Sequence, residues 1–216
     1  MKVRKPQTPR GARGENPASP PSSGRRSRVD GAGLRTFFAA IARRHPDRTG
    51  VLFLCIGTDR SSGDAYGPLV GTLLAEAGFP LVAGTLDCPC DADRLAGPGV
   101  AIPDGVTVVA VDACLGQPMS VGAYLTAEGP LRPAEAVRGA YGAFGHYSVA
   151  GVVNKTGPRP YAALQTASLG LVLRMARETA EAAAAAWPAA VRPAGLADNP
   201  QRERTDRTED ERKNTP

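Results

Sequence analysis

The chain has 216 residues, of which 42% are hydrophobic, and it carries a formal net charge of +5. This length fits one domain of ordinary size with extensions, and no apolar run reaches the ~20 residues that a membrane span needs. Four cysteines in a chain of this length indicate reduced thiols and not a small disulfide scaffold. Since the N-terminus also lacks the order of a signal peptide, we expect a cytoplasmic protein with no membrane partner.

The two ends of the chain differ in composition from its middle. Residues 1–32 are dominated by Pro, Arg, Ser and Gly, and residues 188–216 end in a mixed-charge run. Neither end has enough apolar side chains to offset the entropy lost on ordering, so we expect both to be disordered. Residues 33–187 then form a single domain. The basic N-terminal end has no aromatic stacking pattern, and we expect no nucleic-acid partner.

The first half of the domain alternates helical and strand patterns. Apolar residues at helical spacing predict a helix over 34–44, which should end before Pro46. The run VLFLCI predicts a strand over 51–56 that is buried on both faces. A second helix is expected over 65–77, with Gly78 as its C-terminal cap.

The second half continues this alternation. Apolar, β-branched runs predict strands over 81–86, 106–111 and 147–153, and the stretch 121–126 is a strand or a hairpin arm. Helical patterns predict a short helix over 133–140 and a long final helix over 162–186. The alternation of strands and helices predicts an α/β fold of three layers, in which a mostly parallel sheet lies between helices.

In sheets of this kind the ligand site lies beyond the carboxyl ends of the strands, where the strand order reverses. If the first three strands of the domain take the order 2-1-3, this point lies between the first strand and the third. Two segments then face each other there, GTDRSSGD at 57–64 and DACLGQPM at 112–119. We therefore expect the site to form between these two segments.

Each of these segments carries an aspartate, Asp64 in the first and Asp112 in the second. Two carboxylates within a few ångströms do not both ionise readily, so one keeps a proton and the other can act as a base. Such a pair can activate a water against an amide and protonate the departing group. Two structural roles remain open, namely Asp64 as the N-cap of the next helix and Asp112 as a strand-end turn residue.

Other chemistry fits the sequence less well. The segment GTDRSSGD has neither the Lys-Ser/Thr ending of a P-loop nor the G-x-G-x-x-G spacing, and its carboxylates would repel phosphate. Cys88 and Cys90 form a C-x-C pair, unlike the paired C-x-x-C knuckles of zinc sites. A nucleophilic cysteine needs a histidine as its base, and the chain has only 2 histidines. We therefore expect no cofactor and no metal.

Five stretches of the chain together resemble the YyaC-type sporulation proteins, namely GTDRSSGDAYGPLVGTLL, GTLDCP, VVAVDACLG, VAGVVNKTG and LQTASLGLVLRMA. The resemblance covers about residues 51–175, in the same order. This family is related to the germination protease that degrades small acid-soluble spore proteins, and more distantly to the hydrogenase-maturation endopeptidases. The resemblance implies a phosphorylase/hydrolase-like α/β fold in a spore-forming bacterium.

The resemblance also implies roles for residues of the site. In the germination protease, the proposed aspartic catalytic pair stands at positions that match Asp64 and Asp112 in this chain. No third site residue is evident from the motifs. The candidate binding residues are Asp59, Asn154 and His146, of which His146 precedes the last predicted strand.

Two functions follow from these patterns. The first is a sporulation-associated aspartic-type peptidase that acts on a protein or peptide substrate. The alternative is a non-catalytic protein of the same fold, whose acidic crevice binds a peptide, a metal ion or a protein partner during sporulation. The alternative is motivated by the missing third site residue and by the segment Cys88-Pro89-Cys90, which stands where the family pattern has Asn-Pro.

Overall fold

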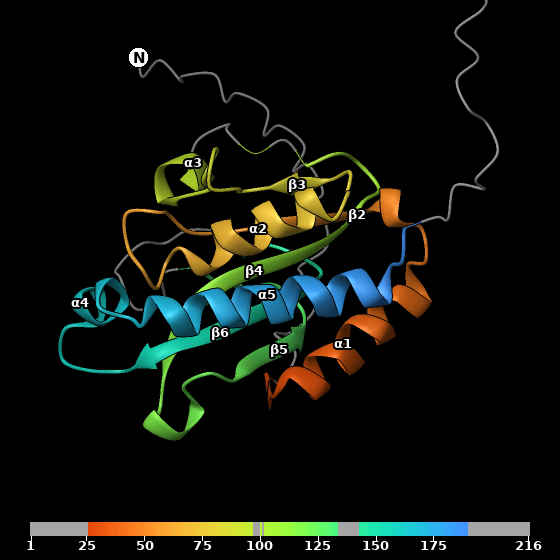
Figure 1. The fold of residues 1–216 in the computed structure, drawn as a ribbon. Helices are drawn as coiled ribbons and strands as arrows, with labels where there is room; N and C mark the ends of the chain where they lie inside the picture. Colours follow the sequence, from red (N-terminus) through yellow and green to blue (C-terminus); the bar gives the residue numbers. More distant parts are fainter. Residues whose placement is uncertain (1–25, 97–99, 101, 134–142, 190–216) are drawn as a thin grey trace, which may run out of the picture.

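Six strands form one sheet in the order β1–β5–β6–β4–β2–β3 (Figure 1). The computed structural model describes residues 26–96, 100, 102–133 and 143–189. Four neighbouring strands are parallel, and β5 and β1 are added antiparallel at one edge. The strands are β1 (Ser27–Val29), β2 (Val51–Cys55), β3 (Val82–Ala83), β4 (Thr107–Gly116), β5 (Tyr124–Glu128) and β6 (Tyr147–Lys155).

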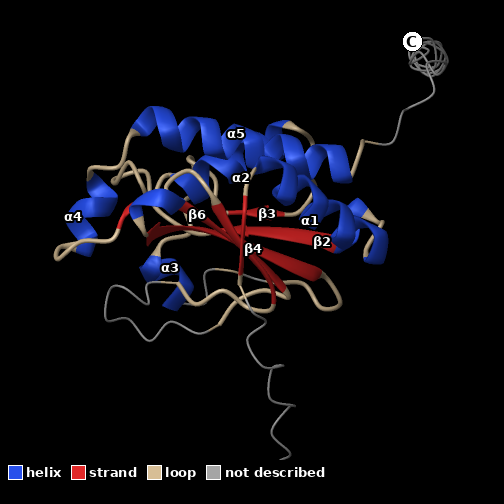
Figure 2. Ribbon diagram, turned by 90° about the horizontal axis from the view of Figure 1, so that it is seen from below, coloured by secondary structure: helices blue, strands red, loops and turns tan. Residues whose placement is uncertain are grey.

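Three long helices cover one face of this sheet, and a short helix lies on the other face (Figure 2). The long helices are α1 (Gly31–Arg44), α2 (Tyr66–Glu76) and α5 (Leu169–Ala186). The short helix on the opposite face is α3 (Ala92–Ala96), and α4 (Pro160–Gln165) connects β6 to α5. Two 3-10 turns, η1 (Arg48–Gly50) and η2 (Pro118–Ser120), precede β2 and β5. The expected α/β fold with a mostly parallel sheet is confirmed.

The parallel part of the sheet begins β3–β2–β4, which is the order 2-1-3 expected for the first three predicted strands. β2 is buried along its whole length, as its continuous apolar run predicts. β2 and β4 lie side by side, with Cys55 paired to Val111. The residues that follow these two therefore meet at the carboxyl end of the sheet.

Aromatic side chains close the amino end of the parallel strands. Trp187 follows α5, is 2% exposed, and packs its ring edge-on against Phe38, Phe53 and Phe79. Its indole Nε1 donates a hydrogen bond to the carbonyl oxygen of His45 at 2.8 Å. We call these four rings the aromatic cluster. It joins the end of α5 to α1 and β2.

Hydrogen bonds of the His45 side chain complete the closure of this end. The ring lies between two strands, with Nδ1 3.0 Å from Thr107 Oγ1 of β4 and Nε2 3.2 Å from the Tyr147 hydroxyl of β6. Both ring nitrogens therefore have a partner. His45 thus links α1, whose last residue precedes it, to the starts of two parallel strands.

Several predicted elements differ in extent from the observed ones, and for β4 and the final helix the structure shows the cause. β4 ends at Gly116 and not at Val111, because β6 pairs with it as far as Gly116. The predicted final helix is divided in two, since α4 ends at Gln165 and Ser168 caps α5 by accepting a hydrogen bond from the amide of Leu171. In both cases tertiary contacts outweigh the local pattern.

The ordered domain begins before residue 33, where the sequence placed its boundary. β1 pairs with β5, and Asp30 caps α1 by accepting a hydrogen bond from the amide of Gly33 at 2.9 Å. The predicted disorder of residues 1–25 and 190–216 lies outside the described residues, as does the helix over 133–140 from residue 134 on. None of the helices in the described part of the chain has the length and hydropathy that a bilayer crossing needs.

Candidate functional site

The loop after β2 lies tightly against the start of α2. Gly57 has a φ of +142°, and a Cβ atom there would lie 2.0 Å from the carbonyl oxygen of Asp64. A Cβ atom on Gly67 would lie 1.9 Å from the carbonyl oxygen of Ile56. Both positions require glycine, because the loop, the strand end and the helix approach too closely for a side chain. This close approach brings Asp64 back over the end of β2.

The loop is also held from the side of α4. The hydroxyl of Ser62 donates to the carbonyl oxygens of Gln165 and Ala167, each at 2.9 Å. The amide of Gly63 donates to the carbonyl oxygen of Leu164 at 2.9 Å. The turn that carries the first aspartate is therefore fixed between β2 and the connection from α4 to α5.

Asp64 does not cap the helix that follows it. The N-cap position of α2 belongs to Ala65, and no side chain accepts a hydrogen bond from the first amides of this helix. The interpretation of Asp64 as an N-cap is therefore wrong. Its carboxylate is half-buried and lines a pocket.

Asp112 lies inside β4, paired with Ala150 of β6, and not in a turn after the strand. The alternation of side chains along β4 places it on the same face as Val108 and Ala110, toward α3. Its Oδ1 accepts a hydrogen bond from the amide of Ala113 at 2.8 Å. The interpretation as a strand-end turn residue is wrong, because pairing with β6 extends the strand past this position.

The two aspartates line the same pocket, which has a volume of about 460 Å³. A pocket of this size can bind a small ligand or a short part of a peptide. Its charged lining side chains are Asp64, Asp112, Arg26, Arg60, Asp91, Asp93 and Arg132. Its larger apolar lining side chains are Ile56, Leu95, Leu115, Leu131, Tyr161 and Leu164. The strand order thus brings the two carboxylates to one pocket.

Burial sets the protonation of this pair. Burial raises the pKa of Asp112 to about 8. The hydrogen bond from the Ala113 amide lowers this pKa, and the charge of Asp64 raises it further. Burial also raises the pKa of Asp64, and the nearby hydroxyl of Ser61 opposes this rise. Asp112 therefore keeps its proton at neutral pH. The charge of Asp64 thus disfavours ionisation of Asp112.

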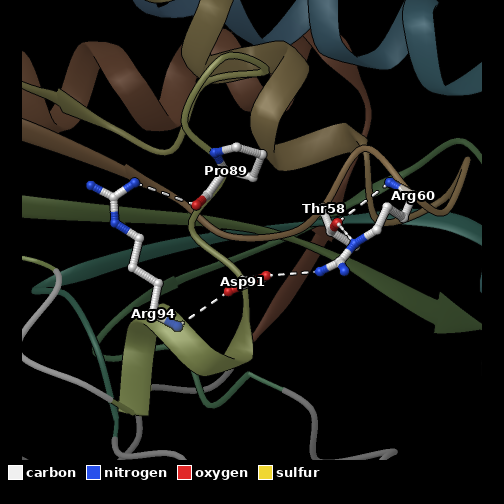
Figure 3. A network of polar contacts seen from close by, with 5 residues as sticks. All are labelled: Thr58, Arg60, Pro89, Asp91 and Arg94. Carbon is white, nitrogen blue, oxygen red and sulfur yellow. Dashed lines mark hydrogen bonds and ion pairs between the residues drawn. The ribbon is translucent and has the colours of Figure 1, made fainter.

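An ion pair joins two walls at the mouth of the pocket (Figure 3). Arg60 donates through Nη2 to Asp91 Oδ2 at 3.0 Å and through Nε to Thr58 Oγ1 at 3.2 Å. The other carboxylate oxygen of Asp91 accepts from the amide of Arg94 at 3.1 Å. The Arg94 guanidinium donates to the carbonyl oxygen of Pro89 at 3.5 Å. These contacts tie the loop after β2 to α3 and to the segment before it.

The other predicted site residues do not line the pocket. Asp59 is exposed. Asn154 uses its amide nitrogen to donate to the carbonyl oxygen of Ala163 at 2.9 Å, which holds α4 against β6. His146 lies at the amino end of β6, where its Nδ1 accepts from the amide of Val108 at 2.9 Å. The expectation that these three residues contribute to the site is corrected, since the structure brings only the aspartate pair together.

Several lining residues escaped the sequence interpretation. Arg26 precedes β1 and belongs to a segment that its composition assigned to a disordered end. Tyr161 and Leu164 come from α4, which the sequence merged with the final helix. No local pattern marks these residues, because the pairing of β1 with β5 and the break before α5 bring them to the pocket. Ser61 is also buried, and its hydroxyl acts on Asp64. In the sequence, only its position between Gly57 and Gly63 could have indicated a role in the site.

The cysteines and the acidic residues form no evident metal centre. Among the described residues, no group of three or more His, Cys, Asp or Glu side chains is placed to hold a metal ion. Burial raises the pKa of Cys90 to about 11 and that of Cys114 to about 12. Both are therefore neutral thiols at neutral pH, and neither has the character of a nucleophile.

This chain is similar in sequence to known proteins. The family model described as "Protein of unknown function (DUF1256)" matches residues 30–182. The uncharacterized protein YyaC of Bacillus subtilis (strain 168) is 38% identical over 160 residues, which make up 68% of this chain and 74% of that protein. The crystal structure of the NiFe hydrogenase maturation protease HycI from Thermococcus kodakarensis KOD1 aligns with 21% identity and a TM-score of 0.40, over 62% of this chain and 92% of that one. From the family match and the B. subtilis relative, we conclude that this chain belongs to the DUF1256 family.

Proposed function

We propose that this protein is an aspartic-type peptidase that hydrolyses a protein or peptide substrate with Asp64 and Asp112. One observation carries the proposal, which is the position of both carboxylates on one pocket together with the raised pKa of Asp112. A pair that holds one proton supplies a base and an acid in the same site. No other described pair of carboxylates combines this burial with a shared pocket of about 460 Å³.

The proposed reaction uses each carboxyl in both of its states. The oxygen of a bound water bonds to the peptide carbonyl carbon, while Asp64 accepts a proton from this water and Asp112 gives its proton to the carbonyl oxygen. When the C–N bond breaks, the proton on Asp64 passes to the leaving nitrogen, and Asp112 takes a proton from a hydroxyl of the tetrahedral intermediate. The pair thereby returns to its starting protonation state.

The walls of the pocket support binding of a peptide. Ile56 and Leu131 lie on the side of α3, whereas Leu115 and Tyr161 come from the end of β4 and from α4. Apolar walls favour side chains next to the scissile bond, and they exclude water from the carboxyls. The same exclusion of water keeps the proton on Asp112.

The setting of the reaction is part of the proposal. We place it in the cytoplasm of a sporulating cell, which the resemblance of the motifs to the YyaC-type sporulation proteins supports. A protein substrate made during sporulation fits this setting.

The test removes one proton-transfer group at a time. The full-length protein and its variants Asp64→Asn and Asp112→Asn are incubated with a library of synthetic peptides, and new termini are counted by mass spectrometry. Each variant should lose cleavage by about 10²–10⁴-fold, because an amide can neither accept nor supply the proton. Asp87→Asn is the matched control, since Asp87 is exposed and does not line the pocket.

Two outcomes would contradict the proposal. If either pocket variant cleaves at the wild-type rate, with far-ultraviolet circular dichroism unchanged, the aspartate pair does not carry the reaction. If the wild-type protein binds peptides in calorimetry but cleaves none of the library, the non-catalytic alternative takes its place.

A further inference from the structure

Ser61 is buried in the loop after β2 without a hydrogen-bond partner for its hydroxyl. The residue is 4% exposed, and its Oγ makes no hydrogen bond of accepted geometry within the described residues. A buried hydroxyl without a partner is unusual and costs free energy. In the described part of the chain, the Nε atom of Arg48 shares this state, but that guanidinium donates through Nη2 to Ala77 and stacks on Phe79. Ser61 therefore calls for another explanation.

The backbone around Ser61 keeps this hydroxyl in place. The carbonyl oxygen of Ser61 accepts from the amide of Ala65 at 2.9 Å, which closes the turn around the intervening residues. Asp64 lies inside this turn, and a Cβ atom on Gly57 would lie 2.0 Å from its carbonyl oxygen, so the loop is closely packed here. Ser61 is thus held at one turn's distance from the Asp64 carboxyl, and its hydroxyl lowers the pKa of that carboxyl.

We propose that Ser61 is a positioning residue of the site, whose buried hydroxyl donates to the Asp64 carboxylate and keeps it ionised and turned toward Asp112. The inference rests on the proposed function, because it assigns the base and the acid within the same pair. It makes Asp64 the base and Asp112 the acid at the start of the reaction. Among the described residues, none donates a hydrogen bond of ordinary geometry to the Asp64 side chain, and Ser61 is the hydroxyl that acts on its pKa.

The neighbouring serine gives a matched comparison. Ser62 is next in the sequence, but its hydroxyl is fully used by the carbonyl oxygens of Gln165 and Ala167. Ser62 therefore holds the loop in place and does not act on the carboxyl, whereas Ser61 has a hydroxyl free for Asp64 among the described residues. Removing either hydroxyl tests a different role of the same loop.

The other charged side chains near the pocket act on Asp64 equally in the variants Ser61→Ala and Ser62→Ala. They come from β4, from the loop after β2, from α3 and the segment before it, from the residue before β1, and from the segment after β5. The charged side chains that line the pocket with Asp64 are Asp112, Arg60, Asp91, Asp93, Arg26 and Arg132. Because neither serine variant changes these charges, a difference between the two variants reports the hydroxyl of Ser61.

The experiment follows the side-chain carboxyl carbon of Asp64 by NMR as the pH is varied, in the full-length protein labelled with ¹³C. In Ser61→Ala, the titration midpoint of Asp64 should move to higher pH than in the wild type, by more than the spread of repeat titrations. In Ser62→Ala the midpoint should stay in place, while the melting temperature falls by about 4 °C with the loss of two hydrogen bonds. In Ser61→Ala any loss of stability should be confined to pH values at which Asp64 is ionised, because only there does the hydroxyl donate to a carboxylate.

Clear outcomes overturn the inference. An unchanged Asp64 midpoint in Ser61→Ala, or an equal shift in Ser62→Ala, would show that the Ser61 hydroxyl does not act on the carboxylate. If Ser61→Ala does not fold, Ser61→Cys decides, since it nearly keeps the volume but supplies a weaker donor. It should move the midpoint in the same direction, and no movement overturns the inference.

The titration separates this inference from the proposed function. It needs no substrate, so a wild-type protein that cleaves no peptide but shows the Asp64 shift contradicts only the peptidase assignment. A wild-type protein that cleaves peptides, with no shift in Ser61→Ala, contradicts only the role of Ser61. Where cleavage is found, the acid limb of the pH–rate profile should move with the Asp64 midpoint, which a purely structural role would not cause.

Discussion

The two ends of the parallel strands are built in different ways. At the amino end, the aromatic cluster is closely packed, and Trp187 and His45 both have hydrogen-bond partners. At the carboxyl end, two carboxyls are held in partly apolar surroundings, and the hydroxyl of Ser61 has no ordinary partner. The amino end therefore pairs the polar groups of Trp187 and His45, although Arg48 Nε beside Phe79 has no partner among the described residues, whereas the carboxyl end holds two acids whose pKa values burial raises.

The amino end of the parallel strands therefore stabilises the fold, whereas the carboxyl end lowers its stability. In open α/β sheets the ligand site lies at the carboxyl ends of the strands, and the amino ends are free to be packed for stability. Burial of Asp112, beside which no cation among the described residues offsets the desolvation, lowers the stability of the folded state at high pH. The aromatic cluster at the far end offsets such a cost without contact with the pocket. Changes at the two ends should therefore affect different properties.

Trp187→Ala should have the largest effect on stability. Removing a ring that is 2% exposed leaves a cavity between α1, α5 and β2, which we expect to lower the free energy of unfolding by about 3–5 kcal/mol. Urea denaturation measures this change. Trp187→Phe keeps a ring and loses the hydrogen bond to His45, so its loss should be smaller. An altered NMR titration of Asp112 in either variant would show that the two ends are not independent.

Gly57→Ala should have a smaller effect on stability but a direct one on the site. The new Cβ would lie 2.0 Å from the Asp64 carbonyl oxygen at a φ of +142°, so the backbone must move, at a cost of about 1–3 kcal/mol. Because the Asp64 carboxyl moves with the backbone, the variant should lose peptide cleavage, and the titration midpoint of Asp64 should shift. Gly50→Ala is the control, because a Cβ atom there meets nothing within 4 Å and should leave both properties unchanged. Equal effects of the two substitutions would refute the tight packing of the loop.

The pH dependence of stability should report the raised pKa of Asp112. Asp112 has an ordinary pKa of 3.8 in the unfolded chain and about 8 in the folded protein, so the folded state holds the additional proton in this range. Stability should therefore fall as the pH rises from about 4 to about 8, by up to about 1.4 kcal/mol for each pH unit. Asp112→Asn removes this contribution, and its stability curve should be flatter over that range. Parallel curves for the two proteins would contradict the raised pKa.

Much of the fold could be predicted because its central strands are continuous apolar runs. VLFLCI and VTVVAV each predicted a buried strand, and the alternation with helices predicted their parallel pairing. β1 could not be predicted, because its three residues have no apolar pattern and are ordered only by pairing with β5. The break before α5 was missed for a similar reason, since Ser62 and Gly63 stabilise it from a distant loop.

The site could be predicted in part. Asp64 lies in the loop after β2 and Asp112 within β4, which is next to β2 in the sheet, so both line the same pocket. The sequence placed Asp112 in a turn, since an aspartate and a glycine after an apolar run resemble a strand end, whereas pairing with β6 continues the strand. His146 precedes β6 and so belongs to the amino end, which the direction of a parallel strand already indicated. The free hydroxyl of Ser61 depends on packing that no local pattern reveals.

The short β1 also matters for how the protein behaves among its own copies. It pairs with β5 through Ser27, Arg28 and Val29, and thereby covers the hydrogen-bonding groups along the outer side of that strand. An uncovered strand of this kind is a template on which another chain can add a strand. Two of its three residues are exposed, and Arg28 carries a charge at the new edge, which discourages further addition. Three residues from the basic end of the chain thus disfavour self-association through this edge of the sheet.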